Sequence, residues 1–449
     1  MIPACPGFNA ICSQLDSGSS IKDQATSMNI AYISADFGVP FWGYRGASIH
    51  LREMVNALRE AGHAVTVFSP AYDETAGAMV KNLEKESAGN FSFLHVQQQE
   101  FLSQLYQELE ALHTFWGLKS RIRQELRNLF YNLQLYEKAL AHLQRQPVDF
   151  IYERYALFSF AGIRLARALG VPHLLEVNAP LAYEQEKTRG LEMKELAREA
   201  ERRIFCETDR VIVVSRQLQE FAASCGVPNS HICVLPNAVD PQHFAVDDHG
   251  RAVRVKYQLE GKRVIGFVGS LKPWHGTETL FEAFRDLYAK APNTHLLIVG
   301  DGPKREALEQ YVQSHDLNGA VTFSGNVAYD DVPQYIAAMD ITVAPYIPHE
   351  NFYYSPIKIF EYMVMGKPVV AGRIGQVEEI VAHGETGVLF DPGNIEQLAA
   401  ALAKLAGDLP LCHRLGEKAR TWVQKERTWE NNARQVVAMA GELIEKRKT

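Results

Sequence analysis

The sequence predicts an α/β fold in which two Rossmann-like domains face each other. Short apolar runs alternate with amphipathic helical patterns, and this alternation is typical of the β-α units that build parallel sheets. It occurs twice, and the turn-rich residues 236–250 between the two series mark a domain boundary. A chain of 449 residues is long enough for two or three domains. Because ligands bind at the carboxyl ends of parallel strands, we expect substrates between the two sheets.

The first domain is expected to cover residues 28–237. Residues 28–35 read as its first strand, and apolar side chains from Leu51 to Leu58 recur at i, i+3, i+4 and i+7 on the helix that follows. Gly62 ends this helix. Further strands are expected at residues 64–68, 91–95, 149–152, 173–177, 211–214 and 232–235.

The chain begins with residues that do not follow the regular alternation. Residues 1–27 mix Pro, Gly, Ser and Asp irregularly and lack the basic start and apolar run of a secretory signal. We therefore predict that residues 1–27 form a disordered tail that is dispensable for folding.

A helical insertion interrupts the first domain between residues 97 and 146. The composition favours helix throughout this interval, with only Gly117 interrupting it, so two or three helices are expected. Its aromatic side chains could make a peripheral contact with a membrane or meet an apolar acceptor, but packing onto the sheet is the commoner explanation. These aromatics are Phe101, Tyr106, Phe115, Trp116, Phe130, Tyr131 and Tyr136.

The second domain is expected to cover residues 238–425. The same alternation predicts a second parallel sheet there. The two halves share no detectable sequence repeat, so we infer no internal duplication. The strands are expected at residues 264–268, 295–299, 321–323, 341–344 and 369–371.

Composition argues against several classes of protein. The net charge of -7 argues against a protein whose main partner is nucleic acid, because such proteins are usually basic. The six cysteines have no paired spacing and no CxxC, which implies neither a zinc site nor a disulfide framework and favours the cytoplasm. Apolar runs such as residues 211–214 have strand length, far below the roughly 20 residues of a membrane-spanning helix.

The strongest local signal is a helix start within residues 353–361. Ser355 can serve as the N-cap and Pro356 suits the first helical position, so free backbone N–H groups would point outward and attract phosphate. Lys358 adds a cation to a helix end that is already positive, which is unfavourable unless an anion binds there. Glu361 lies on the same face, where it can accept hydrogen bonds from ribose hydroxyls. Taken alone, the pattern would describe only a capped helix with a solvated Lys–Glu pair.

A glycine-containing loop at residues 268–276 supports this site. It follows a strand and opens a helix, which suits a cradle for a diphosphate. Gly269 lets the backbone turn closely, and Ser270 and Lys272 offer hydrogen-bond donors. By itself the signal is weak, because Gly commonly ends strands for reasons of turn geometry.

Two further glycine-containing loops lie at expected strand ends. Residues 297–303 form another Gly-rich strand end, which could be only a tight turn. In the first domain, residues 43–48 precede a helix. This loop contains Arg45 and Gly46 and could receive a phosphate or an acceptor group across the cleft.

In this order the motifs resemble glycosyltransferase family 4, whose retaining enzymes have the two-Rossmann B-type fold. The resemblance extends from Met28 to the C-terminus. Seven modest motifs in the expected order and spacing make a chance match implausible. They are the Gly46 loop and residues 234–240, 267–269, 299–303, 323–327, 360–363 and 366–370.

The resemblance implies roles for several residues. Glu361 would bind the donor ribose, the backbone of Val327 would lie near the base, and the backbone N–H groups of Ile357 and Lys358 would hold the diphosphate. The final helix, at about residues 426–449, would cross back onto the first domain. The donor would be a nucleotide sugar, with uridine the family's most frequent base, and no cofactor is implied.

The second domain departs from the family pattern at three positions. The earlier of two glutamates eight positions apart is Tyr353 here, and the usual Arg and Lys of the glycine loop are Ser270 and His275. A leaving diphosphate needs positive charge in the transition state. We infer that Lys272 and Lys358 supply it.

The strand ends of the first domain supply the remaining candidates. Many family members carry a His where this chain has Asn178, which can hydrogen-bond a sugar hydroxyl but cannot act as a base. Catalysis by Asn178 and the two lysines would therefore rest on positioning and leaving-group stabilisation. Arg45, Arg154 and Glu176 are expected to meet the acceptor. Either Arg154 or Glu153 could reach the cleft, and a rim ion pair explains both equally well.

No metal site is expected. The paired carboxylates at residues 247–248 and 330–331 read as solvated turns and a helix start. His50, His63 and His173 show no ligand spacing and are expected to have packing or surface roles.

A retaining glycosyltransferase is the function that these observations favour. The same fold also hosts sugar-nucleotide epimerases, and Tyr353 and Asn178 leave a catalytically inactive binding subunit open. Product analysis separates the three. Transfer releases nucleoside diphosphate only with an acceptor present, epimerisation yields a new nucleotide sugar, and an inactive subunit yields neither.

Overall fold

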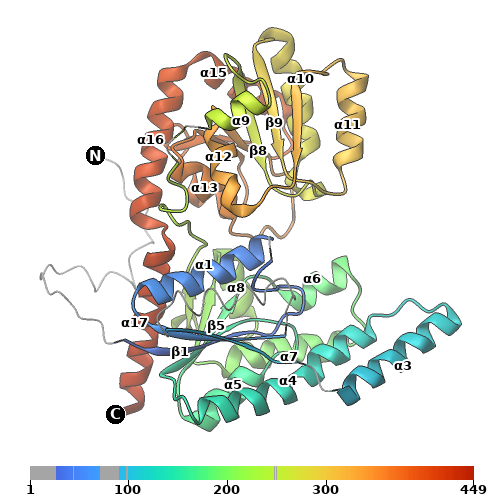
Figure 1. The fold of residues 1–449 in the computed structure, drawn as a ribbon, viewed down its shortest axis with the longest axis vertical. Helices are drawn as coiled ribbons and strands as arrows, with labels where there is room; N and C mark the ends of the chain where they lie inside the picture. The colour runs from blue at the N-terminus through green and yellow to red at the C-terminus, as the bar shows by residue number, and fades with distance from the viewer. Residues whose placement is uncertain are drawn as a thin grey trace, which may run out of the picture.

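Two parallel sheets, each flanked by helices, are stacked along the long axis of the molecule (Figure 1). The computed structural model describes residues 27–43, 45–70, 90–97, 100–246, 248 and 250–448. Within these ranges the first sheet has the strand order β3-β2-β1-β4-β5-β6-β7, and the second has the order β10-β9-β8-β11-β12-β13. The predicted α/β fold with two Rossmann-like domains is confirmed.

Most of the strands are short apolar runs buried on both faces, as parallel strands covered by helices require, and the edge strands β3 and β10 are only partly buried. The first sheet comprises β1 (Asn29–Ser34), β2 (Ala64–Ser69), β3 (Phe91–His95), β4 (Phe150–Arg154), β5 (His173–Val177), β6 (Arg210–Val213) and β7 (Ile232–Val234). The second comprises β8 (Arg263–Val268), β9 (Thr294–Val299), β10 (Val321–Gly325), β11 (Ile341–Ala344), β12 (Val369–Gly372) and β13 (Gly387–Phe390). The expected strands agree with these bounds to within two residues, except that β13 was not expected.

Helices connect the strands and cover both sheets. In the first half they are α1 (Gly46–Glu60), α3 (Glu100–Trp116), α4 (Ile122–Leu143), α5 (Ala161–Leu169), α6 (Leu181–Thr188), α7 (Lys194–Glu207) and α8 (Arg216–Ser224). In the second half they are α9 (Arg251–Lys256), α10 (Thr277–Lys290), α11 (Arg305–Ser314), α12 (Val332–Ala337), α13 (Ile357–Val364), α14 (Val377–Ile380), α15 (Ile395–Gly407), α16 (Leu409–Glu426) and α17 (Trp429–Lys448).

The C-terminal helix α17 returns to the first sheet. Figure 1 shows α16 and α17 running one after the other along one side of both sheets. The α17 side chains Trp429, Ala433 and Val436 share a buried core with Leu51 and Met54 of α1. The end of the chain therefore ties the second half of the molecule to the first.

The helical insertion consists of α3 and α4, but its aromatics divide between packing and exposure. Tyr131 of α4 packs with Leu135 in the core beneath the first sheet, and Tyr106 is also buried. The expectation that all of the aromatics pack is wrong for four of them. The exposed fractions are 65% for Phe101, 82% for Phe115, 64% for Trp116 and 43% for Phe130.

The predicted N-terminal tail lies outside the described residues, except for its last member. Ser27 Oγ donates to the carbonyl oxygen of Gly62 at 2.7 Å, so this residue contacts the fold. Asp247 of the paired carboxylates also lies outside the described ranges. Among the described residues, no helix has the length and apolarity needed to cross a bilayer.

Candidate active site

The candidate site forms where the carboxyl ends of β8 and β9 meet the start of α13. Gly269 has a φ of 141° and Gly300 a φ of 130°, a region that favours glycine. The Gly269 amide donates to the carbonyl oxygen of Val299 at 2.8 Å, which holds the two strand-end loops together. A Cβ on Gly269 would lie 2.6 Å from Lys358 Nζ. The loop thus leaves room for the lysine only because it carries glycine there.

Lys358 directs a shielded ammonium group into this site. Its Nζ is buried without a hydrogen-bond partner and lies 4.2 Å from the ring centroid of Phe267 and 5.8 Å from that of Tyr346. Burial lowers the pKa of Lys358 to about 7, although the nearby Glu361 carboxylate opposes this. A buried cation without a hydrogen-bonding partner destabilises a protein. A bound anion would relieve that cost.

Glu361 lies one helical turn further along α13 and is 6% exposed. Burial raises the pKa of its carboxyl to about 7, while Lys358 and a hydrogen bond from Tyr329 act in the opposite direction. The predicted Lys358–Glu361 pair is therefore buried, which rules out a solvated pair on a capped helix.

The predicted cap of this helix is wrong. Pro356 occupies the N-cap position, and α13 begins at Ile357 without a side-chain cap. The Ser355 hydroxyl instead accepts a hydrogen bond from the backbone amide of Asn237 at 2.9 Å. Since this contact joins residues 118 apart in the sequence, local spacing could not reveal it. The N–H groups at the start of α13 consequently have no side-chain cap.

The loop that follows β8 brings two more predicted residues to the site. His275 Nδ1 donates to the carbonyl oxygen of Ser270 at 2.5 Å, which leaves Nε2 as the acceptor nitrogen. Burial and the nearby Lys358 and Lys272 lower the pKa of His275 to about 3, so its ring is neutral at pH 7. Lys272 is exposed, and its Nζ lies 4.8 Å from the ring centroid of Trp274. The lysines, and not His275, therefore supply positive charge here.

The first-domain strand ends do not meet the cleft as expected. Glu176 is 1% exposed, and its oxygens accept hydrogen bonds from three side chains. It accepts hydrogen bonds from Tyr152 Oη at 2.5 Å, from Arg154 Nη1 at 2.9 Å and from Asn178 Nδ2. His50 Nε2 lies 2.8 Å from Glu176 Oε1. Glu176 therefore has no free oxygen for an acceptor.

The pKa of Glu176 reflects this network. Burial opposes ionisation of the carboxyl, but His50, Arg154 and Tyr152 together lower its pKa well below the usual range. Arg154 pairs with Glu176 in the interior and does not form the expected rim pair. The alternative, Glu153, is fully buried and lies 3.0 Å from His173 Nε2. Arg154 and Glu176, which were expected to meet the acceptor, thus pair with each other inside the first domain.

The Glu176 network continues to the start of α13 through residues that sequence analysis missed. His50 Nδ1 lies 2.6 Å from Asn237 Oδ1, and Asn237 Nδ2 donates to the carbonyl oxygen of Ser355 at 2.6 Å. A polar chain therefore runs from β5 through α1 and the interdomain segment to the residue before Pro356. The sequence signals this chain only through His50, which lies on the apolar face of α1. Its partner Asn237 is 187 residues away in the sequence, so spacing could not reveal the contact.

Other contacts join the two halves beside this chain. Tyr353, which replaces the family's glutamate, donates from its hydroxyl to Glu184 Oε2 of α6 at 2.9 Å. Ser215 Oγ donates to the carbonyl oxygen of Tyr353 at 2.8 Å. Asn351 Nδ2 donates to Tyr183 Oη at 2.8 Å. The segment leading to α13 is therefore held by hydrogen bonds to residues of the first domain.

The remaining predicted residues lie at separate places around the site. Arg45 is exposed at the N-cap of α1, and Gly46 is the first residue of that helix. A Cβ on Gly46 would meet no atom within 4 Å, so its surroundings are open. Val327 follows β10 and packs against the core of the second domain.

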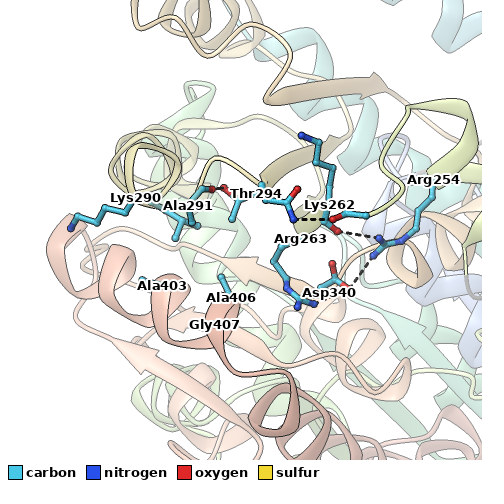
Figure 2. Close-up of a pocket in the computed structure, with 13 residues that line it drawn as sticks. Arg254, Lys262, Arg263, Lys290, Ala291, Thr294, Asp340, Ala403, Ala406 and Gly407 are labelled. Atoms are coloured by element: carbon cyan, nitrogen blue, oxygen red, sulfur yellow. Dashed lines mark hydrogen bonds and ion pairs between the residues drawn. The ribbon is translucent and has the colours of Figure 1, made fainter.

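A cavity of about 580 Å³ lies at the opposite, amino end of the second sheet (Figure 2). Arg254 Nη2 lies 3.0 Å and Arg263 Nη1 3.6 Å from Asp340 Oδ1. Asp340 Oδ2 also accepts a hydrogen bond from the Val264 amide at 2.7 Å. In Figure 2 the ammonium group of Lys290 extends away from Asp340. Arg254 and Arg263 thus have a structural role beside Asp340. Substrates bind at the carboxyl ends of parallel strands, which is the opposite end of this sheet.

Comparison with known proteins identifies the family. A family model described as Glycosyltransferase Family 4 matches residues 44–243, and one described as Glycosyl transferases group 1 matches residues 251–422. A GDP-mannose-dependent alpha-(1-6)-phosphatidylinositol monomannoside mannosyltransferase from Mycolicibacterium smegmatis is 30% identical over 266 residues, covering 58% of this chain and 68% of that protein. The chain belongs to glycosyltransferase family 4. It spans 64% of the length of the similarly named Mycobacterium tuberculosis protein, with 31% identity and 54% of this chain covered.

Solved structures of low sequence identity share the fold of this family 4 chain. HepE from Anabaena, in complex with UDP, has a TM-score of 0.70 at 20% identity, with 93% of this chain and all of that chain covered. Sucrose-phosphate synthase from Thermosynechococcus elongatus has a TM-score of 0.68 at 22% identity, with the same coverage. These likenesses concern the arrangement of the two domains.

Proposed function

We propose that this protein is a glycosyltransferase that moves a sugar from a nucleoside diphosphate sugar to an acceptor with retention of anomeric configuration. The observation that carries the proposal is the shielded Lys358 ammonium, which lacks a hydrogen-bond partner beside a helix start without a side-chain cap. A leaving diphosphate would supply the missing partner. The UDP of the HepE complex and the GDP-mannose of the mycobacterial name support a donor of this class.

The chain's own residues suggest how they would act on such a donor. The N–H groups of Ile357 and Lys358 and the ammonium of Lys358 would hold the diphosphate and stabilise its charge as the bond to the sugar breaks. Lys272 would add a second cation from the glycine loop. Glu361, as a carboxylate, would accept hydrogen bonds from the ribose.

Catalysis would proceed without a base on β5. The Asn178 amide donates to Glu176, which directs its nitrogen inward and leaves its oxygen free to accept from a sugar hydroxyl. An amide does not take up a proton from an attacking hydroxyl. Rate enhancement would therefore come from positioning and leaving-group stabilisation.

The test of the proposal combines binding and product analysis. Purified protein is screened by thermal shift against UDP- and GDP-linked sugars, since a ligand that binds only the folded state raises the melting temperature. The sugar that binds is then incubated with acceptors, and the products are separated. Nucleoside diphosphate released only with an acceptor, and a product with the donor's anomeric configuration, are expected. A new nucleotide sugar would instead identify an epimerase, and binding without turnover an inactive subunit.

Binding of the nucleoside diphosphate is expected to take up more protons slightly above pH 7 than binding of the matching nucleoside, since any proton released by Glu361 at the ribose is common to both ligands. At that pH the lowered pKa of Lys358, about 7, leaves part of its ammonium deprotonated, and a bound diphosphate would raise the pKa again. Calorimetric titrations of the nucleoside diphosphate in buffers of different ionisation enthalpy measure this uptake. The matching nucleoside is the control, because it meets Glu361 but carries no phosphate. Equal proton uptake by the two ligands would contradict a diphosphate at Lys358.

Activity is expected to persist in a chelator of divalent metals. The charge of the leaving diphosphate would be met by Lys272, Lys358 and the α13 N–H groups. Initial rates measured before and after treatment with the chelator should agree. Turnover that disappears and returns with magnesium or manganese would show that a metal carries this charge.

A further inference from the structure

The α3–α4 hairpin carries an exposed apolar stripe that no part of the proposed transfer reaction uses. Figure 1 shows α3 and α4 beside each other, with α3 on the side away from the first sheet. Five apolar side chains of α3 lie within roughly 100° of one face of the helix. Their exposed fractions are 65% for Phe101, 44% for Leu105, 42% for Leu112, 82% for Phe115 and 64% for Trp116. Leu118, in the turn that follows, is 50% exposed.

Positive charge predominates at the tip of this hairpin. Residues 111–124 include Lys119, Arg121 and Arg123 but no acidic residue. Two carboxylates border them: Glu110 Oε2 lies 2.7 Å from Arg123 Nη1, and Glu192 Oε1 accepts from the Arg121 amide at 3.4 Å. The two most exposed members of the stripe, Phe115 and Trp116, lie at this end of α3, with their ring centroids 5.6 Å apart. Aromatic side chains next to cations suit the boundary between lipid headgroups and acyl chains.

We propose that the tip of the α3–α4 hairpin, residues 112–121, docks on the surface of an anionic lipid bilayer. Phe115, Trp116 and Leu118 enter the interface, and Lys119 and Arg121 meet the anionic headgroups. An exposed apolar patch marks an interaction site, and the cations select a negatively charged surface as its occupant. No described helix is suited to crossing the bilayer, so the contact is peripheral.

The position of the acidic residues sets the orientation of the hairpin. Glu108 lies on the same face of α3 between Leu105 and Leu112, and a carboxylate there disfavours burial of the whole helix in lipid. The tip therefore enters first, and the helix rises away from the membrane plane.

The tip end of the hairpin, at the first turn of α4, is joined to the segment between α6 and α7. Glu125 of α4 accepts hydrogen bonds from the amides of Glu192 and Met193, both at 2.7 Å. These residues follow α6, whose Glu184 contacts Tyr353 near the start of α13. Membrane docking thus places α6 and its contact with Tyr353 near the lipid surface. If the proposed transfer is correct, an acceptor embedded in that surface is within its reach.

Sedimentation with lipid vesicles tests the proposal on the full chain. We expect binding to vesicles of phosphatidylcholine with phosphatidylglycerol, and much weaker binding to phosphatidylcholine alone. The double variant Phe115→Ser/Trp116→Ser should lose about tenfold or more of the partition coefficient. Lys119→Gln should lose about fivefold on anionic vesicles only. Both variants should keep the wild-type melting temperature, because the side chains are exposed.

Matched controls separate a specific contact from general stickiness. Val255→Ser removes an apolar side chain that is 54% exposed on α9, and Lys404→Gln removes an exposed cation on α15. Neither should change vesicle binding. Equal binding by wild type and the double variant would overturn the proposal. So would wild-type protein that dimerises in light scattering but loses the dimer in the double variant, because a second copy would then cover the stripe.

Discussion

Replacing Lys358 with Ala is expected to lower kcat/KM by roughly 10- to 150-fold, because it removes a charge-assisted contact of about 1.5–3 kcal/mol. The same change should leave the melting temperature unchanged or slightly raised. Lys358 Nζ is shielded, lacks a hydrogen-bond partner and stands at the positive end of α13, so the free protein loses no hydrogen bond. Removal of a desolvated cation offsets the lost contacts with the Phe267 and Tyr346 rings. Steady-state kinetics and thermal unfolding of the same preparation measure both effects.

Lys367 offers a matched control, because it is a second largely buried lysine close to α13. Its ammonium donates to the carbonyl oxygens of Ala337 at 2.8 Å and Met339 at 2.7 Å. Burial lowers the pKa of Lys367 to about 8. Lys367→Ala should therefore lower the melting temperature and spare kcat/KM of the folded enzyme. The two lysines would show opposite patterns, which general damage to the helix cannot produce.

Glu361→Gln distinguishes the ribose contact from the phosphate contact. Glu361→Gln should weaken the binding of the nucleoside and of the nucleoside diphosphate to a similar extent, whereas Lys358→Ala should weaken the binding of the diphosphate only. Calorimetric binding to the two variants measures this difference. If Lys358→Ala bound the diphosphate as tightly as wild type and Glu361→Gln lost nothing, α13 would be a structural helix and the donor site would lie elsewhere.

The fold could be predicted from the sequence because its signals are local. Runs such as β5 and β11 are short, apolar and separated by amphipathic helices, so their bounds agree with the expected residues. The edge strand β13 escaped detection, since it begins with Gly387, and glycine weakens the signal of a strand. Lys358 and Glu361 could be paired because they are three residues apart on one helix.

The parts of the site that could not be predicted depend on contacts between distant residues. Ser355 reads as a helix cap in isolation, but Asn237 from the interdomain segment occupies its hydroxyl. Arg154 and Glu176 read as cleft residues because they end parallel strands. Adjacent strands bring them together with Tyr152, and α1 adds His50. Sequence spacing predicts where a strand ends, but it does not predict which side chains from neighbouring elements will pair with the residues at that end.

Replacing Glu176 with Gln is expected to lower the free energy of unfolding by about 3–5 kcal/mol, because it leaves the shielded guanidinium of Arg154 without its carboxylate. Arg154 Nη1 and His50 Nε2 lie 2.9 Å and 2.8 Å from Glu176 Oε1, and the carboxylate is shielded from water. Denaturant unfolding at neutral pH measures the loss. Glu199→Gln is the control. The pKa of Glu199 is also lowered, to about 2 by Arg202 and Arg203, but this group is fully exposed and its loss should be hardly measurable.

The pH dependence of stability gives this prediction its sharpest form. The folded pKa of Glu176 lies well below its ordinary value of 4.5, so between these two values the unfolded state binds more protons than the folded state. The contribution of Glu176 is complete above pH 4.5 and is lost as the pH falls through the folded pKa. Wild-type stability should therefore rise with pH across this acidic window, and Glu176→Gln should flatten that rise. Because His50 and Asn237 connect Glu176 to Ser355, the variant should also bind the nucleoside diphosphate less tightly at neutral pH. A variant with an unchanged acid slope and unchanged nucleotide affinity would show that this network neither carries buried charge nor positions α13.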